Sequence, residues 1–216
     1  MKTKIYIIRH GHSIGNLTRT FLGHVDLDLS DLGYKQADCT ANALKNEKID
    51  IIYSSDLSRA YNTALKIANY HTNNVISSEK LREVYAGEWE GLNVDSIIER
   101  WGREEFYDKW VNDFGNYRFP KGESISEARE RVYEEICRIC EENEGKTIAI
   151  STHAAVLRGF WAKISNISLD NVANELPFPT NASYSIVEYE NGVFTAIKYS
   201  FDDHLKEIGI TKVNLV

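Results

Sequence analysis

Ile5-Tyr6-Ile7-Ile8 runs directly into Arg9-His10-Gly11 near the start of the chain, and these seven residues point to the fold class. A short, continuous apolar run is typical of a strand that is covered on both faces in a parallel sheet. A histidine at the end of such a strand stands on a rigid scaffold, with Arg9 beside it to hold an anion and no Cβ at Gly11 to block a close approach. Because histidines after strands are common, this motif needs partners elsewhere in the chain.

Further apolar runs at residues 49–53 and 147–150 have the same pattern, and helical periods lie between the runs. Ser30 is a candidate helix cap, Ser58 is a candidate helix start, and Ser124-x-x-Glu127 is a capping box that opens a third helix. Strands that alternate with helices predict a mostly parallel sheet with helices on both faces.

Two segments depart from this alternation. Residues 93–120 are rich in charge and in aromatic rings, and we expect a small helical cap insertion there, either a substrate lid or an ordinary pair of surface helices packed by its rings. Residues 184–189 and 193–199 flank Asn191-Gly192, which supplies the positive φ angles of a tight β-hairpin. No linker or repeat is visible, so residues 1–216 are predicted to form a single three-layer α/β domain.

The composition is that of an ordinary globular protein, with 43% hydrophobic and 26% charged residues. The net charge is −7 and neither a basic tail nor a basic stripe is present, so we expect no nucleic-acid partner and no membrane partner. The sequence has no signal-peptide pattern and no apolar stretch of the roughly 18 residues that span a bilayer, which predicts a cytoplasmic protein. Three cysteines are too few for a disulfide framework, and Cys137-x-x-Cys140 is expected to be two positions on one helix.

Polar residues follow each predicted strand, and in open α/β sheets ligands bind beyond the carboxyl ends of the strands. The polar residues are Arg9, His10 and Asn16 after the first strand, Arg59 after the second, Glu83 after a short run at 75–77, and His153 after the fourth strand. Two imidazoles, two guanidinium groups, an amide and a carboxylate are the groups that phosphoryl transfer requires. We therefore expect a phosphate site at this edge of the sheet.

Each group has a chemical role in this prediction. A neutral His10 imidazole attacks phosphorus and becomes a phosphohistidine, while the nearby Arg9 and Arg59 lower its pKa and keep it unprotonated. The guanidinium groups, the second imidazole and the amide bind the phosphate oxygens without a metal ion or another cofactor. Glu83 protonates the leaving oxygen and later activates water. His10-x-His12 has no further ligands at useful spacing, so no metal site is expected.

Five motifs, spread over nearly the whole chain, form a specific set. They are Arg9-His10-Gly11-x-Ser13-x-x-Asn16, Asp28-Leu29-Ser30-x-x-Gly33-x-x-Gln36-Ala37, Ser54-Ser55-Asp56-Leu57-x-Arg59-Ala60-x-x-Thr63, Leu81-x-Glu83 with Gly87 and Trp89-Glu90-Gly91, and Thr152-His153-x-x-Val156-Leu157-Arg158. Together they resemble the histidine phosphatase superfamily, in its phosphoglycerate-mutase-like branch. The resemblance implies that fold, a phosphohistidine at His10, phosphate binding by Arg9, Arg59 and His153 with support from Asn16, and proton donation by Glu83.

The leading prediction is a phosphatase, a phosphoric monoester hydrolase that acts on a small phosphorylated metabolite. Mutases of the family usually carry Glu and Trp where this chain has His12 and Gly15, and they have a longer insertion, so both features favour a phosphatase. Two alternatives stay open, a cofactor-dependent phosphoglycerate mutase and a catalytically inactive phosphate-binding module. The expected partner is the small-molecule phosphomonoester itself, with a homodimer as a further option.

Overall fold

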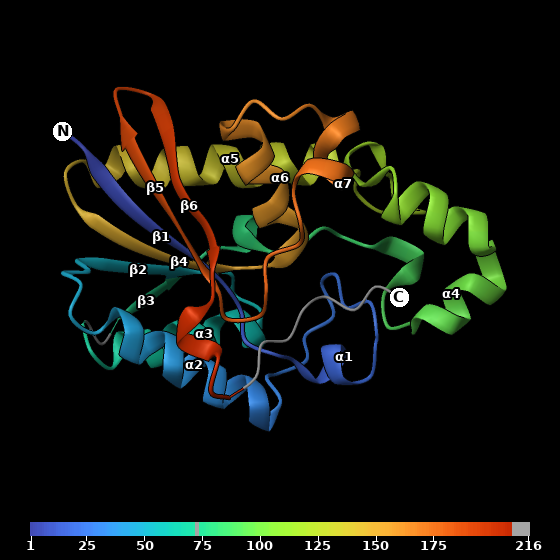
Figure 1. Ribbon diagram of the computed structural model, residues 1–216, viewed down its shortest axis with the longest axis horizontal. Coiled ribbons are helices and arrows are strands. Elements are labelled where there is room, and N and C mark those ends of the chain that lie inside the picture. Colours follow the sequence, from blue (N-terminus) through green and yellow to red (C-terminus); the bar gives the residue numbers. More distant parts are fainter. Residues whose placement is uncertain (72–73, 209–216) are drawn as a thin grey trace.

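The computed structural model describes residues 1–71 and 74–208, which form a central sheet between layers of helices (Figure 1). Its strands are β1 (Thr3–Arg9), β2 (Ile51–Ser54), β3 (Val75–Ser77), β4 (Thr147–Thr152), β5 (Tyr184–Glu190) and β6 (Val193–Phe201). Its α-helices are α1 (Ile14–Leu17), α2 (Asp31–Leu44), α3 (Ser58–Ala68), α4 (Val94–Trp101), α5 (Ile125–Glu142), α6 (Ala154–Ile164) and α7 (Val172–Glu175). Short 3-10 turns span Glu79–Leu81, Gly87–Trp89, Phe114–Asn116, Leu169–Asn171 and Asp203–Leu205.

The sheet has the strand order β3-β2-β4-β1-β5-β6. The first four strands in this order pair in parallel, β5 lies antiparallel to β1, and β6 lies antiparallel to β5. At the hairpin turn, Asn191 and Gly192 have φ angles of 51° and 82°. The predicted mostly parallel sheet and C-terminal hairpin are both confirmed.

Alternate residues of β1 face opposite sides of the sheet, as in any strand. Ile5 and Ile7 belong to a large core cluster that also contains apolar residues of α5 and α6. Tyr6 and Ile8 belong to a smaller cluster with apolar residues of α2 and α3. The strand is thus buried on both faces, which explains why its sequence is a continuous apolar run.

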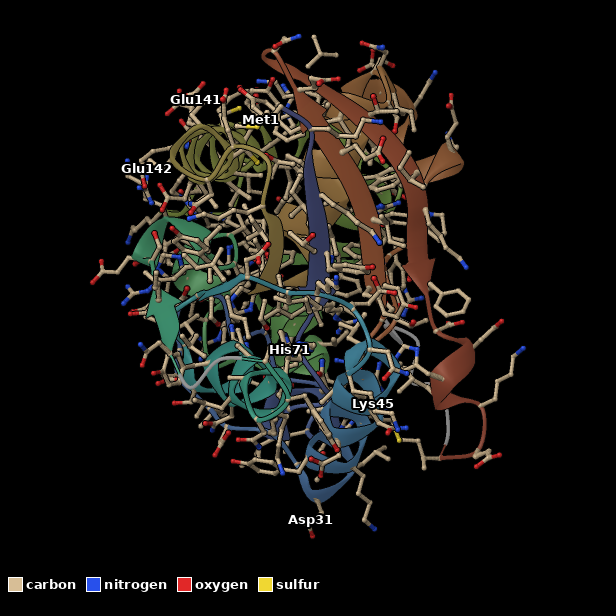
Figure 2. All side chains as sticks on the ribbon, turned by 90° about the vertical axis from the view of Figure 1, so that its left-hand side faces the viewer. Met1, Asp31, Lys45, His71, Glu141 and Glu142 are labelled. Carbon is tan, nitrogen blue, oxygen red and sulfur yellow. The ribbon has the colours of Figure 1, made fainter. Side chains whose placement is uncertain are left out.

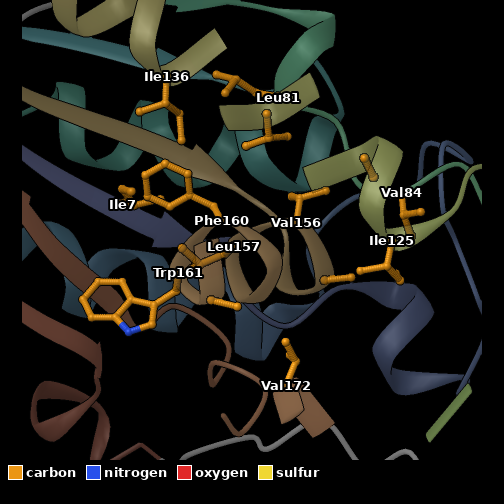
Figure 3. Close-up of a cluster of buried hydrophobic side chains, with 14 of the residues drawn as sticks. Ile7, Leu81, Val84, Ile125, Ile136, Val156, Leu157, Phe160, Trp161 and Val172 are labelled. Carbon is orange, nitrogen blue, oxygen red and sulfur yellow. The ribbon is translucent and has the colours of Figure 1, made fainter. Parts of the chain in front are cut away.

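Helices cover each face of the sheet with an apolar side and present a charged side outward. Figure 3 shows Ile136 of α5 and Phe160 of α6 close to Ile7 of β1, and all three side chains are buried. Figure 2 shows Glu141 of α5 and Asp31 of α2 at the outer surface of the two helical layers, where both are exposed. The predicted three-layer architecture is confirmed.

Two of the three predicted helix starts have side-chain caps. The Ser30 hydroxyl accepts a hydrogen bond from the backbone of the third residue of α2, and Ser124 forms the expected capping box with Glu127. Helix α3 begins at Ser58 without such a cap, and the backbone N–H and hydroxyl of Ser58 instead donate to the Asp26 carboxylate at 2.8 Å each. This contact ties α3 to the loop that follows α1.

The insertion at residues 93–120 is helical, as expected, and consists of α4, a π-helix (Glu105–Val111) and one of the 3-10 turns. The rings of Phe106, Trp110 and Phe119 are buried and belong to the large core cluster. Packing by its own rings therefore anchors the insertion to the body of the molecule.

The three cysteines are free thiols, and Cys137 and Cys140 both lie on α5, as predicted. Within residues 1–71 and 74–208, no helix combines the length and the apolar character that a bilayer span requires.

Candidate active site

A cavity of about 760 Å³ lies at the carboxyl ends of the parallel strands. Five of the six predicted site residues line it, namely Arg9, His10, Asn16, Arg59 and Glu83. The sixth, His153, is not on the cavity wall, but its ring packs edge to face against the ring of His10, with 5.1 Å between centroids. The strand topology therefore brings all six residues together.

Each of these residues ends a parallel strand or lies in the segment that follows one. Arg9 ends β1, Asn16 lies on α1, Arg59 is in the first turn of α3, and Glu83 follows the turn after β3. His153 is the residue between β4 and α6. Because the carboxyl ends of parallel strands meet at one edge of a sheet, residues up to 144 positions apart in the chain share one site.

The His10 ring is held in one tautomer. Its Nδ1 lies 2.7 Å from the Gly11 carbonyl oxygen, and because a carbonyl only accepts hydrogen bonds, Nδ1 carries the proton. Nε2 is then the unprotonated nitrogen, and it has no hydrogen-bond partner within the described residues. Burial, followed by the positive charges of Arg59 and Arg9, lowers the pKa of His10 well below 6.5. His10 is thus a neutral imidazole with a free nitrogen.

Both guanidinium groups are buried and anchored to backbone carbonyls. Arg9 donates from Nη1 to the Pro179 oxygen at 2.6 Å, and Arg59 donates to the oxygens of Val25 and Gly23 at 2.9 and 2.8 Å. Burial lowers the pKa of each arginine to about 10, with the negative charge of nearby Glu83 opposing the shift. Both therefore stay positively charged at neutral pH and fix two cations at the cavity.

The Glu83 carboxylate lies at the N-terminus of α6. One oxygen accepts from the backbone N–H of Ala155 at 3.0 Å, and the other accepts from Val156 at 3.1 Å and from Val84 at 3.0 Å. Backbone donors at a helix N-terminus hold an acceptor group in a fixed position. Glu83 is thereby oriented at the cavity wall beside the two arginines.

The Asn16 amide is oriented by three donors to one atom. Its Oδ1 accepts from the backbone N–H and the hydroxyl of Ser13, both at 3.0 Å, and from Nδ2 of Asn181 at 3.1 Å. Since the oxygen is occupied, the NH₂ group is the part of the amide that is left to donate to a ligand. Asn16 lines the cavity, so it can serve an anion there.

His153 is fully buried, and both of its ring nitrogens lack a hydrogen-bond partner among the described residues. Burial, followed by the charge of Arg59, lowers the pKa of His153 well below 6.5. A buried imidazole without partners is costly unless a ligand supplies one. The most direct acceptor would be a ligand atom bound next to His10.

Gly11 is required for a different reason than the sequence suggested. It does not line the cavity, and a Cβ built on it would lie 2.5 Å from the Gly33 oxygen of α2. Its backbone N–H donates to the Thr63 hydroxyl of α3 at 3.1 Å. The glycine lets the loop after β1 pack directly against α2 and α3, rather than making room for a ligand.

The family model of the histidine phosphatase superfamily (branch 1) matches residues 5–202. The chain belongs to this superfamily. Phosphoserine phosphatase 1 of Hydrogenobacter thermophilus is 30% identical over 205 residues, which cover 94% of this chain and 95% of that protein.

Solved structures of other proteins have the same fold. Bacillus stearothermophilus YhfR matches with a TM-score of 0.87 at 27% identity, covering 94% of this chain and 99% of that chain. A mutant of the Entamoeba histolytica phosphoserine phosphatase in complex with phosphoserine matches with a TM-score of 0.80 at 27% identity and the same coverage. The fold and family expected from the sequence motifs are confirmed.

Asn181 is a residue of this histidine phosphatase site that the sequence interpretation missed. It is 1% exposed, it lines the cavity, and its Nδ2 contacts both the Asn16 oxygen and, at 3.3 Å, the His10 carbonyl. The predicted site residues all follow strands in the sequence, whereas Asn181 precedes β5. Because β5 runs antiparallel to β1, its beginning lies at the same edge as the ends of the parallel strands.

Two further histidines of this histidine phosphatase lie close to the six predicted site residues. The Nε2 atom of His24 lies 2.8 Å from the Glu83 carbonyl oxygen, and this contact agrees with a role of His24 in packing the loop. His12 lines the cavity, and its Nδ1 lies 2.8 Å from the Ser30 hydroxyl. Neither histidine takes the place of His10 or His153.

Proposed function

We propose that this histidine phosphatase hydrolyses phosphomonoesters of small metabolites through a phosphohistidine on His10. One observation carries the proposal, a neutral imidazole whose free Nε2 lies at a cavity wall beside two charged guanidinium groups. Imidazole in this form is a nucleophile, and the two cations attract the phosphate dianion to it.

In the first step, Nε2 of His10 attacks phosphorus while the ester P–O bond breaks. Arg9 and Arg59 stabilise the charge on the equatorial oxygens, with the Asn16 NH₂ group and a His153 N–H as neutral donors. The departing alkoxide takes a proton from Glu83, which must be protonated when the substrate is bound.

In the second step, Glu83 accepts a proton from water as the water oxygen attacks the phosphoryl group. The Nε2–P bond breaks and inorganic phosphate leaves, so His10 returns to its neutral form. We propose that no metal ion takes part, because the two buried guanidinium groups already supply two positive charges at the phosphate position. Turnover should therefore be unchanged by a chelator.

Product analysis tests the hydrolase against the mutase, which would use the same residues. Relatives include a protein named phosphoserine phosphatase, so L-phosphoserine and 3-phosphoglycerate are the first substrates. We expect the release of stoichiometric phosphate from the purified protein. Rapid formation of 2-phosphoglycerate with little free phosphate would contradict the hydrolase, and the absence of turnover on a broad panel of phosphomonoesters would favour the inactive binding module.

A further inference from the structure

The cavity extends well beyond the residues assigned to the phosphate. Its volume of about 760 Å³ is in the range of sites that hold drug-sized ligands, roughly 300–1,000 Å³. A three-carbon leaving group such as that of phosphoserine would leave most of this space unfilled. The rest of the cavity wall therefore contributes to the choice of the alcohol that leaves from the substrate.

Four aromatic rings that line the cavity form one continuous surface, here called the aromatic wall. They are Phe21, Trp110, Phe119 and Phe178. Trp110 touches the other three rings, with centroid distances of 5.7 Å to Phe21, 4.9 Å to Phe119 and 6.2 Å to Phe178. Offset and edge contacts at these distances are the stable arrangements of aromatic pairs.

The aromatic wall is held from behind. The Arg158 guanidinium lies 4.2 Å from the centroid of the Phe178 ring, and its Nε donates to the Leu176 carbonyl at 2.7 Å. Trp110 and Phe119 are 3% and 1% exposed, so they form the back of the wall, and the half-buried Phe21 and Phe178 present its accessible surface. An apolar surface that is already formed and fixed binds a ligand without an ordering cost.

Two rings of the aromatic wall are close in sequence to the residues that anchor the two arginines. Phe178 precedes Pro179, whose carbonyl accepts from Arg9, and Phe21 is two residues from Gly23, whose carbonyl accepts from Arg59. Two parts of the wall are thus tied to the two guanidinium anchors. The rings and the two guanidinium groups line the same cavity, so one ligand can contact both.

Few charges on the cavity wall remain for a second charged group on the substrate. Apart from the residues assigned to the phosphate, Arg19 and Asp202 are the charged side chains that line the cavity within the described residues, and they have opposite signs. Arg19 is exposed to solvent, and the Asp202 carboxylate already accepts from the Thr180 hydroxyl at 3.0 Å, so the attraction of each for a charged group on the substrate is weakened. The wall thus favours an uncharged leaving group.

We propose that the preferred substrates are phosphomonoesters whose alcohol carries an uncharged apolar body, preferably flat, that packs on the aromatic wall. This inference rests on the proposed phosphatase activity and assigns Phe21 and Phe178 as the residues that determine specificity, with Trp110 and Phe119 holding them in place. Burial of a phenyl group on such a surface is expected to raise kcat/KM by tenfold or more.

A matched pair of substrates tests this inference on the wild-type protein. The leaving alcohols of 3-phenylpropyl phosphate and n-propyl phosphate are both primary and of similar acidity, so the chemistry at phosphorus is the same and only the apolar body differs. We expect kcat/KM for 3-phenylpropyl phosphate to exceed that for n-propyl phosphate and for L-phosphoserine by at least about tenfold. Equal values, or a preference for phosphoserine, would overturn the inference and leave the phosphatase activity standing. No phosphate release from any of the three would overturn both.

A ring substitution then locates the effect. Phe178 is half-buried, so Phe178→Leu keeps an apolar side chain at the wall, and Phe194→Leu is the control because Phe194 of β6 does not line the cavity. We expect Phe178→Leu to lower kcat/KM for 3-phenylpropyl phosphate at least threefold more than it lowers kcat/KM for n-propyl phosphate. An equal loss on both substrates, or the same selective loss in Phe194→Leu, would overturn the assignment. If Phe178→Leu does not fold, the ratio of kcat/KM for the two substrates on the wild-type protein still tests the inference.

Discussion

At the scale of single residues, the sequence predicted which side chains meet but not what surrounds them. Arg9, His10 and His153 are predictable because each ends or follows an apolar run, and topology places such residues at one edge. The expected lowering of the His10 pKa is confirmed in direction, yet its largest cause is burial rather than the two arginines. Burial of a polar residue depends on tertiary packing, and the apolar run that precedes His10 carries no information about that packing.

The role of Glu83 predicts a dependence on the leaving group. Glu83→Gln removes the proton that an alkoxide needs, so kcat/KM for alkyl phosphates should fall about 10²–10⁴-fold. An activated aryl phosphate needs little protonation, and its kcat/KM, which covers the steps up to departure of the alcohol, should fall much less. Steady-state kinetics on both kinds of substrate measure the difference. Equal losses would show that Glu83 is not the general acid.

The hydrogen bond from Asn181 to Asn16 predicts coupling between the two amides. Asn181→Ala should weaken inhibition by inorganic phosphate about fivefold, since it removes one of the three donors that orient the Asn16 amide. If Asn181 acts through Asn16, the double variant should bind phosphate no more weakly than Asn16→Ala alone. Inhibition constants for the wild type, the two single variants and the double variant complete this double-mutant cycle. If the two losses in phosphate binding were fully additive, this role of Asn181 would be contradicted.

At the scale of elements, the approach of the loop after β1 to helix α2 explains why the resemblance motif includes Gly33. A Cβ at Gly33 would lie 1.9 Å from the His12 carbonyl oxygen. Helix periods and caps could be predicted from the sequence, because they depend on neighbours along the chain. The close approach of the loop to α2 could not be predicted from the sequence, because it is a contact between the backbones of two separate segments.

Gly33→Ala should destabilise the protein although alanine is the better helix former. Helix propensity favours alanine by about 1 kcal/mol, but the overlap with the loop should cost about 1–3 kcal/mol more than that. Denaturant unfolding gives the free energy of unfolding, with Gly159→Ala of α6 as the matched control. At Gly159 the nearest atom to an added Cβ is in the Arg129 side chain at 3.3 Å, so this control should stay within about 1 kcal/mol of wild type. A Gly33→Ala variant as stable as the control would contradict the packing argument.

At the scale of the whole molecule, three apolar runs, the helical periods between them and a turn motif were enough to predict the sheet, both helical layers and the C-terminal hairpin. Patterns of this kind report burial on two faces, and few topologies satisfy them. The cavity beyond the phosphate position was not predictable in the same way. Its aromatic wall joins segments around residues 21, 110, 119 and 178, which no local pattern links.

The two buried histidines also predict how the stability of the whole fold depends on pH. Burial lowers the pKa of His10 and His153 well below 6.5 in the folded state, whereas the unfolded chain protonates each near 6.5. The unfolded state therefore binds more protons below this pH, and the free energy of unfolding should fall by about 1.4 kcal/mol per pH unit for each histidine. Urea unfolding from about pH 7.5 to about pH 5.5 measures the slope. The double variant His10→Gln/His153→Gln should have a shallower slope, and an unchanged slope would contradict the assignment.

The central claim is that Nε2 of His10 carries the phosphoryl group during turnover. Its most direct test is mass spectrometry of peptides from protein mixed with an activated aryl phosphate and quenched in alkali, using Glu83→Gln to slow release of the intermediate by water. The account predicts a phosphoryl group on the peptide that contains His10, and none after His10→Ala. Turnover by the wild-type protein with no phosphohistidine at residue 10 in either the wild type or Glu83→Gln would contradict it.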